Sequence, residues 1–441
     1  MPADTIFALA TPPGRSGVAV MRLSGREAGS ILDAAIAGKR PRPRHAVLRR
    51  LLDAAGTLID QGLVLWFPGP HSFTGEDSAE FQIHGGPAVI EALADRLAGL
   101  GARLAEPGEF TRRAFEHGKL DLTEAEGLAD LIDAETGAQR EQALAQMSGA
   151  LRQLYEDWRE RLIDALAAIE GEIDFPDEEG VPEKLAETAG PILSALANDL
   201  SEHLDDGRRG ERIREGFGIA IIGPPNAGKS SLLNALARRD AAIVTDIPGT
   251  TRDIVEVRMD LGGYAVTLAD TAGLRETEDV VEKEGVRRAL TRADSADLVV
   301  GLLDGSATWN QEMTPVLERS DILVFGKADL PQVLTLPDSL EPDFALSART
   351  SKGVGDLEWH LAGIVSERLS KREMPALSRL RHRRNVEAAR GALARAQQRL
   401  TDPELAGEDV RLAVRALEGL TGRIDVEHVL DAVFSRFCIG K

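Results

Sequence analysis

Short runs of alternating hydrophobic and polar residues mark the N-terminal part of the chain, and this alternation is typical of half-buried strands. The strands that it predicts are Thr5–Ala10, Val18–Leu23, Ala46–Leu52, Leu63–Phe67 and Ala79–Ile83. The segment Pro87–Leu100 predicts a helix instead, because proline stands in its first turn and Gly101 follows its end. Residues 1–118 are therefore expected to form a mixed α/β domain.

The period of the hydrophobic pattern lengthens after residue 118. Apolar side chains then recur every three or four positions, as at Leu151, Leu154, Tyr155, Trp158, Leu162 and Leu166. We expect helices throughout 119–215, with a loop at the acidic, proline-bearing stretch Asp174–Glu179, and again over 372–441. Residues 216–371 alternate strands and helices, so they predict a mostly parallel sheet with helices on both faces. The expected architecture is a helical domain split in sequence by an inserted α/β domain.

Composition narrows the functional classes. A chain of 441 residues exceeds one ordinary core, so two or three domains are expected. The single cysteine, Cys438, excludes an internal disulfide and a thiol cluster for zinc or iron–sulfur. A net charge of −20 argues against non-specific nucleic-acid binding by the whole surface, whereas the basic cluster Arg379–Arg384 fits a solvated helix face and a docking patch equally well. No apolar run has bilayer length and no signal-peptide pattern opens the chain, so a cytoplasmic location without membrane contact is expected.

A phosphate-binding loop is the strongest chemical signal in the chain. The stretch Gly223–Ser230 fits the pattern G-x-x-x-x-G-K-[ST], follows the apolar run Phe217–Ile222 and precedes the helical stretch Ser231–Leu236. Its glycines let backbone N–H groups converge on a phosphate, and the helix start adds unpaired N–H donors. Lys229 can reach the β- and γ-phosphates, and the hydroxyl of Ser230 is a hard oxygen ligand suited to Mg²⁺. These residues predict a nucleotide-binding protein.

Two stretches farther along supply what a nucleotide switch needs. Asp270–Gly273 follows the predicted strand Ala265–Ala269, so Asp270 can hold Mg²⁺ through water and the N–H of Gly273 can meet a γ-phosphate. Between this motif and the phosphate loop lies Thr245–Thr251, where a threonine could complete the Mg²⁺ shell only while the γ-phosphate is present. A loop that orders only around the γ-phosphate would act as a switch.

Two further motifs predict the base that the nucleotide carries. Lys327–Asp329 and Ser347–Arg349 each follow an apolar run. Asp329 is placed to accept two hydrogen bonds from the guanine edge, which adenine cannot donate. Each motif is weak alone, but the ordered set resembles the translation-factor-related GTPases, with their Ras-like P-loop fold, throughout residues 216–371.

The GTPase motifs depart from the usual pattern at two positions. Gly326 stands where the guanine motif begins with Asn, which removes one side-chain contact to the base and keeps an ATPase open as an alternative. Leu274 stands where Ras-like enzymes carry a Gln that orients the attacking water. Because Leu can neither orient nor polarise a water, hydrolysis must get help from elsewhere.

Motifs outside the GTPase module point to one family. The N-terminal part contains Asp4–Ile6, Ala10–Arg15, His84–Gly86, Pro107–Thr111 and Gly118–Leu122, and the chain ends in Phe434–Lys441, FSRFCIGK. With the GTPase motifs, this combination closely resembles the bacterial MnmE family, also called TrmE, of tRNA-modification GTPases, and the likeness covers the whole chain. The resemblance implies an N-terminal fold similar to that of folate-dependent aminomethyltransferases.

The resemblance also implies a reaction and its partners. The protein would be a homodimer that binds a one-carbon tetrahydrofolate, 5-formyl or methylene, in an N-terminal domain that also dimerises. The partner MnmG, also called GidA, would alone carry FAD and would complete a heterotetramer or larger complex. The two would use GTP to add a carboxymethylaminomethyl or aminomethyl group to C5 of the wobble uridine, position 34, of certain tRNAs. The tRNA substrate would bind mainly through the partner.

Folate contacts fall by the same likeness on residues near both ends of the chain, which are Arg22, Glu80, Lys119 and Lys441. A carboxylate such as that of Glu80 can accept the paired N–H donors of a pteridine edge, and Arg or Lys suits the anionic glutamyl tail. Cys438 fits a catalytic thiol and a small buried residue equally well.

In the GTPase module the resemblance assigns two metal ions. Mg²⁺ falls on Ser230 and Thr251. Potassium falls beside the phosphates, where its charge replaces that of an arginine finger. The potassium ligands that the likeness implies are Asn226, Thr245, Ile247 and Thr250.

Catalytic roles fall by resemblance on Lys229, Thr251 and Glu282, with Glu282 helping to orient the attacking water after G domains from two subunits meet. The expected GTP contacts are Asn226, Ala227, Gly228, Lys229, Ser230, Ser231, Thr245, Asp246, Ile247, Pro248, Gly249, Thr250, Thr251, Asp270, Thr271, Ala272, Gly273, Lys327, Asp329, Ser347, Ala348 and Arg349.

A GTP-dependent ribosome-assembly or signalling switch, without modification chemistry of its own, is the alternative function. GTPases of that kind have similar G domains. They have no reason to carry the N-terminal motifs or the ending Phe434–Lys441, so these features favour the modification enzyme. A folate bound to the purified protein would favour it further.

Overall fold

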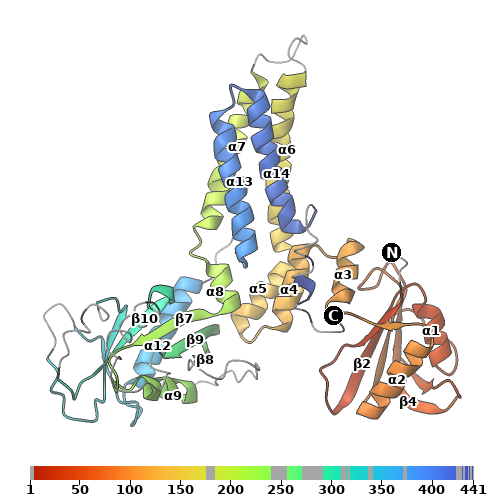
Figure 1. The fold of residues 1–441 in the computed structure, drawn as a ribbon, viewed down its shortest axis with the longest axis horizontal. Helices are drawn as coiled ribbons and strands as arrows, with labels where there is room; N and C mark the ends of the chain where they lie inside the picture. The colour runs from red at the N-terminus through yellow and green to blue at the C-terminus, as the bar shows by residue number, and fades with distance from the viewer. Residues whose placement is uncertain are drawn as a thin grey trace, which may run out of the picture. The chain divides into compact units, whose positions relative to one another are not determined.

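The computed structural model describes residues 4–174, 184–239, 256–270, 291, 293–308, 314, 318–335, 341–370, 375–423, 430, 433–435, 437 and 440. The chain divides into two compact units. The first is Met1–Ala129, Gln146–Gly190 and Arg395–Lys441, and the second is Asp130–Ala145 and Pro191–Ala394. A six-stranded sheet lies in each unit, and helices make up much of the rest, as Figure 1 shows.

The sheet of the first unit contains every strand expected in the N-terminal part, and a sixth that the sequence did not predict. Its order is β3-β4-β5-β2-β1-β6, antiparallel except for the pair β1–β6. The bounds are β1 Ile6–Leu9, β2 Ser16–Ser24, β3 Val47–Leu52, β4 Leu58–Phe67, β5 Ser78–Gly85 and β6 Arg103–Leu104.

Helices α1 (Ala28–Ala35) and α2 (Pro87–Gly99) bury one face of this sheet. Their apolar side chains pack with alternate residues of the strands, among them Met21, Leu51 and Phe81. The prediction of a helix over Pro87–Leu100 is thus confirmed, whereas α1 was missed. On the other face, Leu48 and Leu63 are cross-strand partners that stay 54% and 40% exposed.

Helix α3 (Glu109–Glu116) is fixed to the same unit by a buried ionic network. Arg113 contacts Glu76 at 3.1 Å and Glu109 at 2.9 Å, and Arg103 contacts Glu109 at 2.6 Å. Burial alone would raise the pKa of Glu109, but the hydrogen bond from Arg103, with others, holds that pKa at about 2. The motif Pro107–Thr111 therefore contributes Glu109 to the ion pairs that hold α3 in place.

The first unit also contains α4 (Leu122–Ile132, which continues into the second unit), α6 (Ala150–Asp174), the 3₁₀ turn Leu185–Ala189 and α14 (Pro403–Thr421). Of these, α14 and the 3₁₀ turn pack against α6. Arg159 of α6 contacts Glu418 of α14 at 3.1 Å, and Arg411 of α14 contacts Glu170 of α6 at 2.9 Å. The helical prediction for both halves of the split domain is confirmed; the predicted loop after Asp174 lies outside the described residues.

The chain's C-terminal motif packs into the first unit. Phe434 and Phe437 join Leu122 and Ala125 of α4 in an apolar cluster. Gly108 has φ 70, and a Cβ there would overlap the carbonyl oxygen of Phe434. A glycine is required at this point because of both the backbone angle and the close approach.

Part of the basic cluster Arg379–Arg384 is used inside the second unit. Among the helices of this unit are α5 (Gly137–Met147), α7 (Gly190–Leu204), α8 (Arg209–Glu215) and α13 (Leu380–Gln398). Gly190, the last two residues of α5 and the last four of α13 belong to the first unit. Arg379 contacts Asp130 at 2.6 Å, and Arg383 contacts Asp206 at 2.9 Å with only 9% of each side chain exposed. Arg379 and Arg383 are therefore internal ion-pair partners and not part of a solvated face or a docking patch, whereas Arg384 is exposed.

The second unit's sheet has the order β12-β11-β10-β7-β9-β8, with only the β8–β9 pair antiparallel. The predicted mostly parallel sheet is thereby confirmed. Apolar clusters cover both of its faces, as expected for parallel strands. The bounds are β7 Phe217–Ile222, α9 Lys229–Arg239, β8 Glu256–Leu261, β9 Tyr264–Asp270, β10 Leu298–Asp304, β11 Ile322–Gly326, β12 Phe344–Ala345 and α12 Val354–Leu369.

This topology brings the predicted nucleotide-binding motifs to the edge of the sheet where the parallel strands end. Parallel strands present their carboxyl ends together, and ligands of open α/β sheets bind outside those ends. Strands β7, β10, β11 and β12 all end at this edge. None of the helices described is long and apolar enough to cross a membrane.

Candidate functional site

The phosphate loop has the geometry that its sequence predicts. Strand β7 ends at Ile222, the loop turns through residues with positive φ, and α9 begins at Lys229. A Cβ on Gly223 would overlap the carbonyl oxygen of Leu302, so only glycine fits there. Gly228 has φ +99, and a Cβ placed on it would meet no described atom within 4 Å. The loop therefore approaches open space, as a phosphate cradle requires.

Lys229 is held ready at the start of α9. Its side chain is 5% exposed, and Nζ donates to the carbonyl oxygens of Gly223 and Pro224, both at 2.9 Å. Ser230 and Ser231 are exposed in the same first helical turn. An exposed hydroxyl beside an open cradle of backbone amides fits an Mg²⁺–phosphate group. The hydroxyl oxygen suits Mg²⁺, and the amide N–H groups suit the phosphate oxygens.

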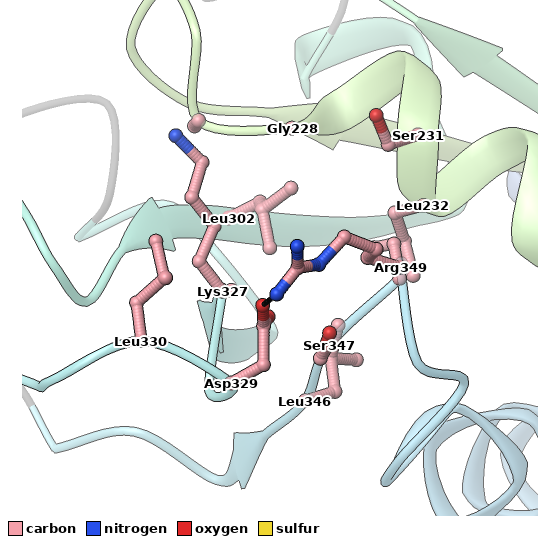
Figure 2. A pocket seen from close by; sticks show the side chains of 13 residues that line it. Gly228, Ser231, Leu232, Leu302, Lys327, Asp329, Leu330, Leu346, Ser347 and Arg349 are labelled. Atoms are coloured by element: carbon pink, nitrogen blue, oxygen red, sulfur yellow. Dashed lines mark hydrogen bonds and ion pairs between the residues drawn. The ribbon is translucent and has the colours of Figure 1, made fainter.

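A pocket of about 290 Å³ joins the phosphate loop to both base motifs (Figure 2). It brings together residues predicted from three separate stretches of sequence, with Leu302 from a fourth. Its lining is Ala227, Gly228, Ser231, Leu232, Leu302, Gly326, Lys327, Asp329, Leu330, Leu346, Ser347, Ala348 and Arg349.

Asp329 is the anionic group of this pocket. Its side chain is 14% exposed and forms an ion pair with Arg349, which Figure 2 marks with a dashed line. Hydrogen bonds from Ser347 and then from Arg349 lower the pKa of Asp329, so the carboxylate is charged at neutral pH. A fixed carboxylate with two oxygens can accept a pair of N–H donors from a base.

Asp304 is a site residue that the sequence analysis missed. Its Oδ2 lies 2.6 Å from Nζ of Lys327, which has φ 55. Burial alone would raise the pKa of Asp304, but the hydrogen bonds from Lys327 and Ser306 together outweigh it and lower the pKa. The available signal was an Asp at the end of the apolar run 298–303, at the same sheet edge as the other motifs.

Gly326 is packed tightly at the end of β11. A Cβ there would lie 3.3 Å from the carbonyl oxygens of Ala227 and Leu303 and from Cδ1 of Leu302. β11 thus packs closely against the phosphate loop at this position, which leaves little room for the Asn side chain that is usual there.

Part of the predicted site falls outside the described residues. These positions are Thr245–Thr251, Thr271–Gly273, Leu274, Glu282, Cys438 and Lys441. The backbone of Asp270 is described: it ends β9, opposite Ile221 of β7. The magnesium motif therefore begins one strand away from the phosphate loop.

A second pocket, of about 340 Å³, lies in the first unit. Nε and Nη2 of Arg22 donate to Oε1 of Glu80 at 3.1 and 3.0 Å. The guanidinium carbon of Arg22 lies 5.7 Å from the ring centre of Phe73 and 5.8 Å from that of Phe110. The lining is Arg22, Arg44, Phe67, His71, Ser72, Phe73, Thr74, Ser78 and Glu80.

The structure brings together some of the predicted folate contacts and separates others. Arg22 and Glu80 pair, and Nη1 of Arg22 lies 3.4 Å from the carbonyl oxygen of Gly440, one residue before Lys441. Lys119 does not line the pocket; its Nζ donates to the carbonyl oxygen of Pro70 at 2.8 Å. Sequence reasoning missed Arg44, which has φ 63, because nothing in its local pattern marks it.

Family comparisons agree with this architecture. The model for the MnmE helical domain matches residues 122–438, and that for the GTP-binding protein TrmE N-terminus matches residues 5–119. The tRNA modification GTPase MnmE of Maricaulis maris (strain MCS10) is 63% identical over 99% of both chains, and that of Phenylobacterium zucineum (strain HLK1) is 53% identical over 100% of both. Among solved structures, the FeoB G-domain from Methanococcus jannaschii matches 34% of this chain and 98% of its own at 25% identity, with a TM-score of 0.25. The chain belongs to the MnmE family of tRNA modification GTPases.

Proposed function

We propose that this tRNA modification GTPase works with MnmG to add a carboxymethylaminomethyl or aminomethyl group to C5 of the wobble uridine, position 34, of certain tRNAs. The carbon comes from a one-carbon tetrahydrofolate, and GTP hydrolysis drives the cycle. The observation that carries the proposal is the presence in one chain of two separate pockets, one built on the phosphate loop and one on the Arg22–Glu80 pair. A simple assembly switch would need only the first.

In the nucleotide pocket, each group has a role that its environment supports. The loop amides and Lys229 bind the phosphates, and Nζ of Lys229 exchanges its two carbonyl contacts for phosphate oxygens. Ser230, with Thr251, binds Mg²⁺. Asp329 reads the guanine edge, and Lys327, held by its ion pair with Asp304, lies beside the nucleoside.

The hydrolytic step uses residues outside the described part of the chain. Thr245–Thr251 and Thr271–Gly273, with Asp270 at the end of β9, contact the γ-phosphate and its Mg²⁺, and Glu282 helps to orient the attacking water. Potassium, bound by Asn226, Thr245, Ile247 and Thr250, supplies a positive charge beside the phosphates. Asn226 is exposed on the phosphate loop, so its amide oxygen is available for this role.

The second pocket suits the pteridine of a folate. Its volume lies in the range of about 300–1,000 Å³ usual for small-molecule sites. Glu80 offers a carboxylate to paired N–H donors, while Arg22 and Arg44 offer cations to the glutamyl tail. Lys119, which lies outside the pocket lining, and Lys441, which is outside the described residues, complete the proposed folate contacts.

The homodimer forms through the first unit's sheet. Leu48 and Leu63 are paired across strands and leave two adjacent apolar side chains exposed on the face opposite α1 and α2, where a partner subunit could cover them.

The domain bounds of this proposal are 1–118, 119–215, 216–371 and 372–441. The proposed compartment is the cytoplasm.

Folate binding should depend on Glu80 and not on nucleotide. Calorimetry with 5-formyltetrahydrofolate should show Glu80→Ala weakened by at least about tenfold, because a charged hydrogen-bond acceptor is lost. The control Asp33→Ala removes a carboxylate on α1 that forms an exposed ion pair with Arg40, and this variant should bind folate as wild type does. Equal affinity for Glu80→Ala and wild type would remove Glu80 from the site.

Deleting the gene in its native bacterium should leave the wobble uridine of the substrate tRNAs without its C5 group. Mass spectrometry of the nucleosides from purified tRNA is the measurement. A plasmid copy of the wild type should restore the modification, whereas Lys229→Ala should not, since it cannot bind the phosphates. An unchanged nucleoside pattern in the deletion strain would support the assembly-switch alternative.

A further inference from the structure

We infer that Arg349 is an intramolecular stand-in for the guanine base, which holds the carboxylate of Asp329 in the nucleotide-free pocket and must be displaced before a guanine nucleotide binds. The inference rests on the proposed function in one respect, namely that Asp329 reads the guanine edge. It adds a competitor for that carboxylate within the chain itself.

The chemistry of the two ligands is alike. Guanine presents N1–H and its C2 amino group side by side on one edge, and a guanidinium presents N–H donors in a planar fork. Both match the two oxygens of a carboxylate. Figure 2 shows the guanidinium of Arg349 reaching across the pocket to Asp329, among the residues that line it. Nη2 of Arg349 therefore holds Oδ2 of Asp329, one of the two carboxylate oxygens that a base would need.

Burial shows which partner moves. The Asp329 side chain is 14% exposed, whereas that of Arg349 is 76% exposed. Asp329 is also hydrogen-bonded by Ser347, so it stays in place when its other donor changes. Among the described residues, Asp329 is the only side chain to which Arg349 forms a hydrogen bond or an ion pair. Arg349 can thus move into solvent without breaking another polar contact.

The neighbouring cation provides a contrast within the same pocket. Lys327 is bonded to Asp304 at 2.6 Å, and Asp304 also accepts from the hydroxyl of Ser306. Lys327 therefore keeps its own anion and does not compete for Asp329. Of the two cations that line the pocket, Arg349 is the one placed to oppose the base.

The direction of the effect separates this role from an ordinary contact. Removing a cation near a nucleotide normally weakens binding, because the phosphates lose an attractive charge. Removing a competitor strengthens binding. Since an exposed ion pair is weak, the gain in affinity should be about two- to fivefold.

The test uses the full chain and the fluorescent probe N-methylanthraniloyl-GDP. Arg349→Ala should bind the probe about two- to fivefold more tightly than wild type and associate faster, and the gain should shrink at high ionic strength because salt screens the pair. Arg319→Ala, which removes a cation from the exposed pair with Asp294 in the same unit, should leave the affinity unchanged. Unchanged or weaker binding by Arg349→Ala would overturn the stand-in role.

Asp329→Asn distinguishes failure of this inference from failure of the proposed base site. If Asp329→Asn still binds GDP as wild type does, Asp329 does not read guanine and both ideas fall. If Asp329→Asn loses GDP and gains xanthosine diphosphate while Arg349→Ala binds no more tightly, the base site stands and only the stand-in is wrong. Tighter binding by Arg349→Ala together with that switch supports both.

Discussion

Replacing Asp329 by Asn should exchange the base preference of this GTPase from guanine to xanthine. Xanthine carries a carbonyl at C2 where guanine carries an amino group. An Asn amide can donate to that carbonyl and still accept from N1–H, whereas it cannot accept both guanine donors. GDP affinity should fall by roughly 10²–10⁴-fold, since the hydrogen bond from the C2 amino group is lost to an opposing N–H donor and the one from N1–H loses its charged acceptor, and xanthosine diphosphate should bind in its place.

Competition against a fluorescent guanine nucleotide, with GDP, xanthosine diphosphate and ADP as displacers, measures this exchange. The matched control is Asp294→Asn, which changes an exposed carboxylate of the same unit that lies outside the pocket. Gly326 makes the experiment informative, because no Asn side chain at that position assists the base. If ADP displaced the probe from wild type as well as GDP does, the guanine assignment would be wrong.

The parts of the site that could be predicted are local in sequence. The phosphate loop depends on glycines and a lysine within Gly223–Ser230, and its flanking strand and helix follow from patterns a few residues long. Lys327, Asp329 and Ser347–Arg349 could be placed together because parallel strands end at one edge. The structure indeed gathers them around one pocket.

The parts that could not be predicted depend on partners far apart in the chain. Arg383 contacts Asp206, which lies 177 positions away in the sequence. No pattern around RLRHRR indicates that Arg379 and Arg383 are buried against carboxylates. Arg44 lines the second pocket from a turn with positive φ, and Asp304 is chosen only by its distance to Lys327. Pairings of this kind are set by packing, so a single sequence leaves them open.

Asn226→Ala should abolish the acceleration of GTP hydrolysis by potassium. In wild type, single-turnover phosphate release should be at least about tenfold faster in potassium than in sodium, because a cation beside the phosphates replaces an arginine finger, which is worth ~10³–10⁵ in rate. Asn226 is exposed at φ 61 on the phosphate loop, where its amide oxygen can face the cation. GDP affinity should change little, since Lys229 and the loop amides remain.

The backbone at this position requires a second variant. Asn tolerates the left-handed region, whereas Ala is strained there, so Asn226→Ala alone could distort the loop. Asn226→Gly removes the side chain without that strain and should also lose the potassium response, whereas Asn226→Asp keeps an oxygen and should retain it. Because potassium needs an oxygen ligand, the potassium response should follow the presence of a side-chain oxygen in the three variants and not the strain of the backbone. A full potassium acceleration in Asn226→Gly would rule out Asn226 as the ligand.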